Sequence, residues 1–215
     1  MRPHRRRTDA AARAYMRSVG RELPPAGPRV KVDPATGRRI ALAYIAMEND
    51  PNDPEVRAAY NAFASELFDQ WEFVKSVVRI DFTEGDPYPN SEAMRDDIRQ
   101  NRRLRVFTGG EPHPILSYIV HPETGRSAND IFRAVHDVFG HAKEGNQFGP
   151  SGEENAWLDH SMMFSREAQR ALTTETRGQN SYFNYAPQNE GKPVAEKQYA
   201  QQKAGLLPDE FLPPA

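Results

Sequence analysis

The clearest periodic pattern in the chain is an apolar stripe between residues 54 and 78. It consists of residues three or four positions apart, namely Tyr60, Phe63, Leu67, Trp71, Val74 and Val78. This spacing predicts an amphipathic helix whose stripe faces a core. Asp53 is the expected N-cap of this helix, and Pro54 is its expected first residue.

Weaker periodic patterns predict several further helices. They are expected from Thr8 toward Val19 with Gly20 as the stop, over 91–102, from 128 through His136, over 153–164, over 166–176 with Gly178 as the stop, and over 192–204. Ser127-Ala-Asn-Asp130 is a variant of the capping box and is expected to start the helix that carries His136. Residues 33–37 are expected to form a turn, and the apolar run 40–47 does not by itself indicate a helix or a strand.

Short apolar runs predict a few strands, over 77–82, 104–107 and 115–120. The expected fold class is therefore mainly α, or α+β with a few short strands, in a single compact helical domain around a buried metal site. Prolines between 24 and 28 indicate a linker. We expect an Arg-rich N-terminal arm over 1–29, a metal-binding helical domain over 30–190, and a peripheral helix with a Pro-rich tail over 191–215.

Composition narrows the class of protein. The chain has 215 residues and a formal net charge of -2, and its pI is about 6.3, so a globally basic nucleic-acid binder is not indicated. Cysteine is absent, which excludes disulfides, zinc–thiolate sites and iron–sulfur clusters. No apolar run approaches the roughly 20 residues of a membrane span. We expect a cytoplasmic protein without membrane contact.

Positive charge is concentrated near the N-terminus. Eight arginines stand against one aspartate and one glutamate in the first 29 residues, at Arg2, Arg5, Arg6, Arg7, Arg13, Arg17, Arg21 and Arg29. Such an arm can attract nucleic-acid phosphates or acidic partners. A solvated, partly disordered tail is the alternative interpretation.

Two histidines stand five residues apart in the apolar segment Ile131-Phe-Arg-Ala-Val-His136-Asp-Val-Phe-Gly-His141. Residues i and i+5 of an α-helix lie about 140° apart, which is poor spacing for binding one ion. Gly140 can end or loosen the helix and so let His141 turn toward the same centre. Neutral imidazole binds iron, zinc, copper and nickel, so the pair alone does not identify the metal.

Acidic residues on the next two predicted helices complete the candidate site. Glu175 shares a helical face with small and apolar residues, so it is expected to point inward and to be the third metal ligand beside His136 and His141. Glu153 and His160 share a face because residues seven apart nearly coincide on a helix. Buried carboxylates are costly unless they are paired or bind metal. Each residue alone also fits core packing or an ion pair, whereas the set favours a site for iron, zinc or manganese.

The segment His136-Asp-Val-Phe-Gly-His141 resembles the His-Glu-Leu-Leu-Gly-His segment of the pterin-dependent aromatic amino acid hydroxylases. In that family both histidines bind non-haem iron, and a glutamate two helices later completes a facial triad. Glu175, in Thr173-Thr-Glu-Thr-Arg-Gly178, stands where the family has a Thr-Val-Glu-Phe-Gly-like segment. The resemblance covers residues 130–179 and implies Fe(II) held by His136, His141 and Glu175 in a mainly helical, basket-like fold.

The chain also departs from that family. Asp137 replaces the glutamate that follows the first histidine, and the family's Pro-Glu-Pro-Asp lead-in is absent. We locate no pterin site in the sequence, so the resemblance leaves pterin dependence and an amino-acid substrate open. The same six-residue segment is also similar to sequences of uncharacterised phage and mobile-element proteins.

The leading hypothesis is a non-haem Fe(II)-dependent oxygenase or hydroxylase, resembling a monooxygenase, with a two-histidine, one-carboxylate site. Its substrate, a small molecule or a modified residue, is not identified by the sequence. Glu153 and His160 are expected to orient the metal ligands or to move protons.

Three alternatives stay open. In a di-iron site, Glu153 or Glu154 and His160 would bind metal directly. In a zinc-dependent hydrolase, Glu153 or Asp137 would be the general base toward a zinc-bound water. In a non-enzymatic, virion-associated phage protein, the polar cluster would be structural.

Overall fold

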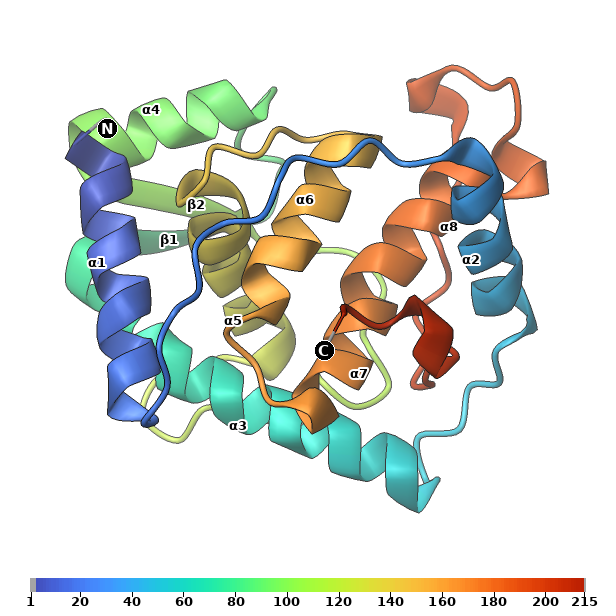
Figure 1. The fold of residues 1–215 in the computed structure, drawn as a ribbon, viewed down its shortest axis with the longest axis horizontal. Helices are drawn as coiled ribbons and strands as arrows, with labels where there is room; N and C mark the ends of the chain where they lie inside the picture. The colour runs from blue at the N-terminus through green and yellow to red at the C-terminus, as the bar shows by residue number, and fades with distance from the viewer. Residues whose placement is uncertain (1–2, 215) are drawn as a thin grey trace.

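Helix α3 (Pro54–Val77) is the longest element of the fold and lies along one side of it (Figure 1). The computed structural model describes residues 3–214, with side chains described from Arg6 onward. The predicted apolar stripe is buried, and the Asp53 carboxylate accepts hydrogen bonds from the backbone N–H groups of Glu55 and Val56 at 2.8 and 3.0 Å. The predicted helix and its N-cap are therefore confirmed.

The fold is mainly helical, as the sequence predicted, with one small sheet (Figure 1). The other α-helices are α1 (Pro3–Ser18), α2 (Pro34–Ala46), α4 (Ser91–Asn101), α5 (Ala128–His136), α6 (Pro150–Ser161), α7 (Arg166–Thr173) and α8 (Gln179–Tyr185). Two π-helices, η1 (Asp137–Ala142) and η2 (Thr174–Gly178), continue α5 and α7, and short 3-10 turns, η3 (Pro187–Asn189), η4 (Val194–Glu196) and η5 (Asp209–Phe211), follow α8. Among the described residues, no helix combines the length and the apolar composition that crossing a membrane requires.

The N-terminal arm is mostly a packed helix in the described structure. Helix α1 buries Ala11, Ala12, Tyr15 and Met16 against the core, and the ring of Tyr15 lies 5.8 Å from that of Phe73 on α3. Its predicted start at Thr8 was too late, because the helix begins at Pro3. Arg2 lies outside the described residues.

The two strands β1 (Arg79–Thr83) and β2 (Arg103–Phe107) pair in parallel, as two of the three predicted strands. The third prediction, a strand over 115–120, was wrong. The buried ring of His113 accepts hydrogen bonds from the backbone N–H groups of Ile115 and Leu116 through Nδ1, at 3.0 and 2.9 Å. These N–H groups are therefore unavailable to a sheet, and the side chains of Ile115 and Leu116 are buried in a loop instead.

Residues 33–37, predicted as a turn, instead begin helix α2 (Pro34–Ala46), which also includes most of the apolar run 40–47 that indicated neither a helix nor a strand. The Asp33 carboxylate accepts from the backbone N–H of Thr36 at 3.0 Å, and Pro34 occupies the first position of α2. The Asp-Pro pair was therefore a helix start, the arrangement also seen at Asp53-Pro54. Gly37 allows close packing, because a Cβ there would lie 2.4 Å from the ring of Tyr185.

The predicted peripheral helix over 192–204 was also wrong, since only the single turn η4 forms there. The segment is held extended by contacts with other elements. The Lys203 ammonium donates to the carbonyl groups of Tyr44, Ile45 and Met47 at the end of α2, and the Ala204 N–H donates to Asn49. The last residues also pack inward, with Phe211 and Leu212 buried.

Candidate metal site

The π-helix η1 brings the two histidines of the candidate site together. The Ser127 hydroxyl caps α5 by accepting from the Asp130 N–H at 3.1 Å, and the helix runs without a break through His136 into η1. In a π-helix each N–H bonds to the carbonyl five residues earlier, so its turn is wider than an α-helical turn and residues i and i+5 come closer to the same side of the helix. The rings of His136 and His141 accordingly lie 5.1 Å apart at an interplanar angle of 89°.

Gly140 is required by close packing and does not end the helix. A Cβ at this position would lie 2.9 Å from Cε1 of His136 and 3.2 Å from the carbonyl oxygen of Ala156 on α6. The glycine therefore leaves room for the His136 ring and lets α6 approach η1. The sequence suggested that Gly140 ends or loosens the helix. The helix continues past Gly140, and its loosened form is the π-helix η1.

Glu153, on the first turn of α6, is the carboxylate that joins the two histidines. Its Oε2 lies 3.3 Å from Nε2 of His141 and 4.0 Å from Nε2 of His136. One ligand atom from each of the three residues lies within 4.8 Å of the other two. Both histidines are buried, while the Glu153 side chain is 28% exposed. This is the one group of metal-binding side chains that the described part of the chain offers.

The hydrogen bonds behind His136 run from Gln70 through His160 to Nδ1 of His136. Nε2 of His160 lies 2.9 Å from the amide oxygen of Gln70, which can only accept, so His160 carries its proton there. Nδ1 of His160 therefore accepts from Nδ1 of His136 at 3.1 Å. The remaining nitrogen of His136, Nε2, is buried and has no hydrogen-bond partner in the described structure.

The other imidazole is oriented in the same way. Nδ1 of His141 donates to the backbone carbonyl of Asn146 at 3.3 Å, which directs Nε2 toward Glu153. Two ring nitrogens and a carboxylate oxygen thus converge on one point. In metal sites, a histidine ligand usually donates the N–H of its other ring nitrogen to a neighbouring group, and this hydrogen bond selects the ring tautomer.

The charges of the group favour a cation between its members. Burial opposes ionisation of Glu153, but the two histidines outweigh it and lower the pKa of its carboxyl to about 2. Burial lowers the pKa of His136 and, more strongly, that of His160, so both rings are neutral. Burial acts in the same sense on His141, but the Glu153 carboxylate prevails and raises its pKa.

A second layer ties this group to the extended segment before α2, which crosses α6 (Figure 1). Arg29 forms a two-pronged ion pair with Asp159, at 2.6 and 3.0 Å, and donates to the Asn146 side chain at 2.8 Å. The Asn146 amide donates to the carbonyl of Gly140 and to Asp159. Arg29 therefore supports the loop whose carbonyl group orients His141.

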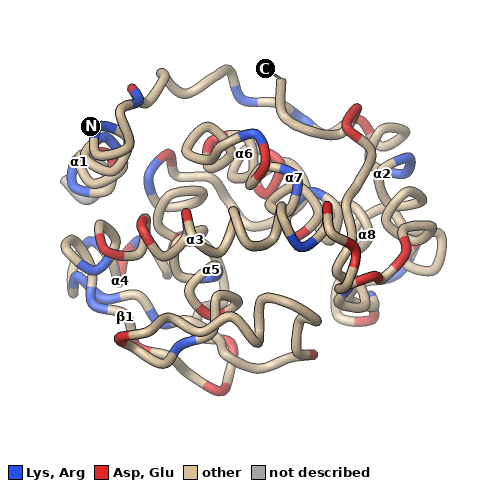
Figure 2. The backbone as a smooth tube through the Cα atoms, turned by 90° about the horizontal axis from the view of Figure 1, so that it is seen from below, with Lys and Arg blue, Asp and Glu red and all other residues tan. Residues whose placement is uncertain are grey.

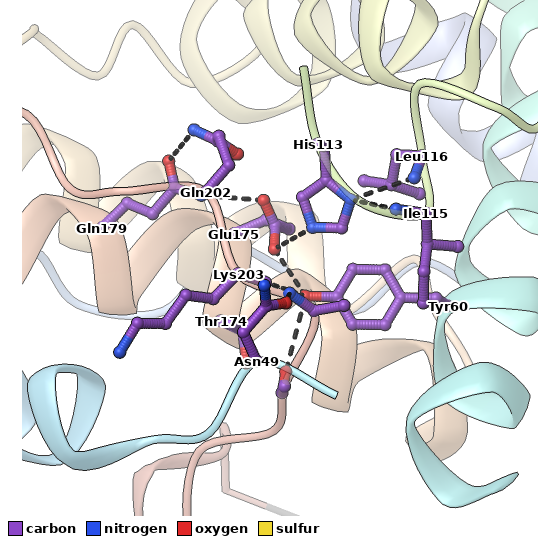
Figure 3. A network of polar contacts seen from close by, with 12 residues as sticks. Asn49, Tyr60, His113, Ile115, Leu116, Thr174, Glu175, Gln179, Gln202 and Lys203 are labelled. Atoms are coloured by element: carbon purple, nitrogen blue, oxygen red, sulfur yellow. Dashed lines mark hydrogen bonds and ion pairs between the residues drawn. The ribbon is translucent and has the colours of Figure 1, made fainter. Parts of the chain in front are cut away.

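Glu175, the expected third ligand, is not placed with the two histidines. It lies on η2, where its Oε1 accepts from the hydroxyl of Tyr60 at 2.5 Å and from Nε2 of His113 at 3.1 Å (Figure 3). Its Oε2 accepts from the Gln179 amide at 2.8 Å. Three donors from three parts of the chain thus occupy this carboxylate. The helix expected to stop at Gly178 instead continues through η2 into α8.

The other candidate residues have distinct places. Asp137 is half-buried beside the histidines, and burial raises the pKa of its carboxyl to about 7. Glu154 forms an ion pair with Arg177 at 2.7 Å. Both ring nitrogens of His160 are hydrogen-bonded. Neither Glu154 nor His160 is therefore free to hold a second metal ion in this arrangement.

A pocket of about 630 Å³ opens in front of the group. His136, His141, Glu153, Asp137 and Glu175 all reach its wall. The remaining wall is largely aromatic or apolar, contributed by Phe107, Phe132, Phe148, Phe183, Val194 and Tyr199. Its size suits a small-molecule ligand, and a mostly apolar wall with a few convergent polar groups is typical of ligand sites.

Sequence reasoning missed several residues of the site, of which Gln70 left the clearest signal. Gln70 lies on the buried stripe of α3, three residues after Leu67 and four before Val74, and it is fully buried. A polar side chain on a core stripe needs a partner. Tyr60, His113 and Asn146 left no comparable signal, because their partners come from distant segments.

The chain matches no protein-family model, no curated protein and no solved structure, so the interpretation of the site depends on its geometry.

Proposed function

We propose that this chain is a non-haem Fe(II)-dependent oxygenase in which His136, His141 and Glu153 hold one iron ion. The observation that carries the proposal is the buried Nε2 of His136, which has no hydrogen-bond partner among the described residues. A buried acceptor without a partner costs about 1–3 kcal/mol. Two neutral imidazoles and one carboxylate, with open positions on the remaining side, form the donor set of the non-haem iron oxygenases.

The pocket in front of these residues supports the same proposal. Bound iron would supply the activation of dioxygen, and the aromatic wall would exclude water and seat an organic substrate of small-molecule size. His160 holds the His136 ring, and Asn146 holds the His141 ring, so the ligands are oriented before metal arrives. Asp137, which follows His136 in the chain and lies in the wall of the same pocket, is a carboxyl group that can exchange a proton with a substrate.

A zinc-dependent hydrolase is the second candidate, because two histidines and a glutamate also form the donor set of catalytic zinc. The position of Asp137 favours it, since a carboxylate beside the metal is what activation of a bound water requires. Metal identity separates the two functions.

The test is metal analysis of protein purified without a metal-affinity tag, followed by anaerobic titration with Fe(II). We expect one iron per chain and, after nitric oxide is added, the EPR signal of a high-spin ferrous nitrosyl adduct, which reports an open position. His136→Ala and Glu153→Gln should lose both, while Glu175→Gln should keep both. One equivalent of tightly held zinc without iron binding would favour the hydrolase. If no metal binds and chelation leaves the melting temperature unchanged, both proposals are wrong and the cluster is structural.

A further inference from the structure

A second cleft, of about 690 Å³, lies beside β1 and is separate from the metal pocket. It includes Arg79, Ile80 and Phe82 of β1, whereas the metal pocket includes Arg105, Val106 and Phe107 of β2. Four basic residues line it, Lys75 at the end of α3, Arg79 in β1, Arg102 after α4 and Arg126 before α5. No acidic side chain is among its described lining residues, and basic segments gather beside α4 and β1 in Figure 2.

Two of these four basic residues lack a counter-charge. Lys75 and Arg79 form exposed ion pairs with Glu72 and Asp81, at 2.7 and 2.9 Å. Arg102 and Arg126 form no ion pair with any described residue, and Arg126 is positioned over the ring of Phe82 at 4.2 Å. Because the whole chain carries a net charge of -2, this local excess does not follow from its composition.

Arg102 also occupies an unfavourable backbone position. Its φ and ψ are 49° and 42°, and it is the one non-glycine residue with positive φ in the described structure. Helices that end in this left-handed conformation usually place glycine or asparagine there. An arginine kept at a strained position beside a basic cleft points to a use for its charge.

Trp71 contributes a hydrogen-bond donor without an acceptor. Its ring lines the cleft, and its buried indole N–H has no partner in the described structure. An indole nitrogen can only donate. The guanidinium groups of Arg102 and Arg126, which line the cleft without a counter-charge, need an anionic oxygen as their acceptor.

We propose that this basic cleft binds a small molecule that carries a phosphate or pyrophosphate group. Several positive charges exceed what a single carboxylate needs, and guanidinium groups match phosphate oxygens in pairs. The cleft has the volume of a small-molecule site. Its charge is confined to one cleft and does not form the extended stripe that a nucleic-acid backbone follows. The proposal does not depend on the metal site, which shares no lining residue with the cleft.

The test is calorimetric titration of the full chain with inorganic pyrophosphate and with phosphate, at constant ionic strength. Metal is first removed by chelation, because pyrophosphate also binds metal ions. We expect saturable binding, tighter for pyrophosphate than for phosphate, and roughly tenfold weaker binding in each of Arg102→Asn and Arg126→Gln. Arg102→Asn suits the left-handed position, so its melting temperature should not fall.

Two controls make the result specific. Arg38→Gln removes an exposed arginine of α2, paired with Glu190 and outside the cleft, and should not change the affinity. His136→Ala disables the metal site and should not change it either. The proposal would be overturned if pyrophosphate did not bind saturably, if neither Arg102→Asn nor Arg126→Gln changed the affinity, or if Arg38→Gln weakened binding as much as they do. Tighter binding of single-stranded oligonucleotides through the same arginines would overturn it in favour of nucleic acid.

Discussion

Two histidine–carboxylate clusters reach the same pocket, and they differ in how completely their hydrogen bonds are satisfied. In one, Nε2 of His136 is buried without a partner and converges with His141 and Glu153. In the other, Glu175 accepts from Tyr60, His113 and Gln179 (Figure 3). Each cluster includes a π-helix, η1 in the first and η2 in the second.

The difference shows why residue types alone do not identify a metal ligand. Both clusters contain a buried imidazole and a carboxylate near an apolar core. His113 accepts two backbone hydrogen bonds at Nδ1, so Nε2 carries the proton and donates to Glu175. Neither ring nitrogen of His113 therefore has a lone pair available for a metal ion. His136 donates from Nδ1, so its Nε2 lone pair faces the pocket group. The cluster of His136, His141 and Glu153 therefore has a lone pair free for a metal ion, whereas the cluster around Glu175 has none and supports the structure.

The largest expected contrast is in metal affinity. His136→Ala should weaken Fe(II) or Zn(II) binding by about 1,000-fold or more, beyond the 10–100-fold typical of groups behind the ligands. His113→Ala should leave the number of bound metal ions unchanged, because that ring faces Glu175. Both affinities can be measured by competition with a chelator of known affinity. If His113→Ala lost metal and His136→Ala kept it, His113 would be the metal ligand and His136 the supporting residue.

The next largest contrast is in the free energy of unfolding of the metal-free protein when each of the two carboxylates is removed. Glu175→Ala leaves the buried His113 without its acceptor and leaves the Tyr60 hydroxyl only the carbonyl oxygens of Lys203 and Gly205, at 3.4 Å, so it should lower the free energy of unfolding by about 2–4 kcal/mol. Glu153→Ala should cost less, because its side chain is 28% exposed and water can replace it. Urea denaturation in a chelating buffer compares the two. An equal or larger loss in Glu153→Ala would contradict the distinction between a binding and a supporting carboxylate.

The two π-helices offer a matched pair of glycine substitutions. Gly140→Ala places a methyl group against the His136 ring and the fixed backbone carbonyl of Ala156, so we expect a loss of about 1–3 kcal/mol. Gly178→Ala meets only the side chains of Tyr44 and Leu207, which can move. Its cost should be smaller, since the gain of about 1 kcal/mol in helix propensity is common to both variants and only Gly140→Ala meets a backbone atom. Thermal unfolding of both variants measures the two losses of stability. A larger loss of stability in Gly178→Ala would contradict the prediction and show that η1 has room for a methyl group.

The smallest expected effect comes from the segment behind the metal group. Arg29→Met leaves Asp159 buried without its ion pair and loosens Asn146, so metal affinity should fall by roughly tenfold. Arg38→Met, which breaks an exposed ion pair with Glu190, is the matched control and should leave the affinity unchanged. If Arg29→Met also binds metal like the wild type, the segment does not support the orientation of His141.

Local patterns in the sequence determined most of the helices and part of the site. The apolar stripe of α3, its Asp53-Pro54 start and the Ser127 cap of α5 depend on neighbours within a few residues, so periodicity and capping rules predicted them. The pairing of His136 with His141 was also predicted, because Gly140 between them indicated a loosened helix. The third predicted strand was wrong for a non-local reason, since the His113 ring takes up the backbone N–H groups that a sheet needs.

Tertiary structure alone decided which carboxylate joins the histidines. By helical periodicity both Glu153 and Glu175 face inward, and the sequence cannot count the donors that reach each of them. Tyr60 is 115 residues from Glu175, and His113 is 62 residues away, so their hydrogen bonds exist only once α3, the 113–116 loop and η2 pack together. The same holds for the orientation of the His136 ring, which contacts His160, and His160 in turn bonds to Gln70, 90 residues away from it. The sequence determined the chemistry that is present, and packing determined which lone pairs stay free.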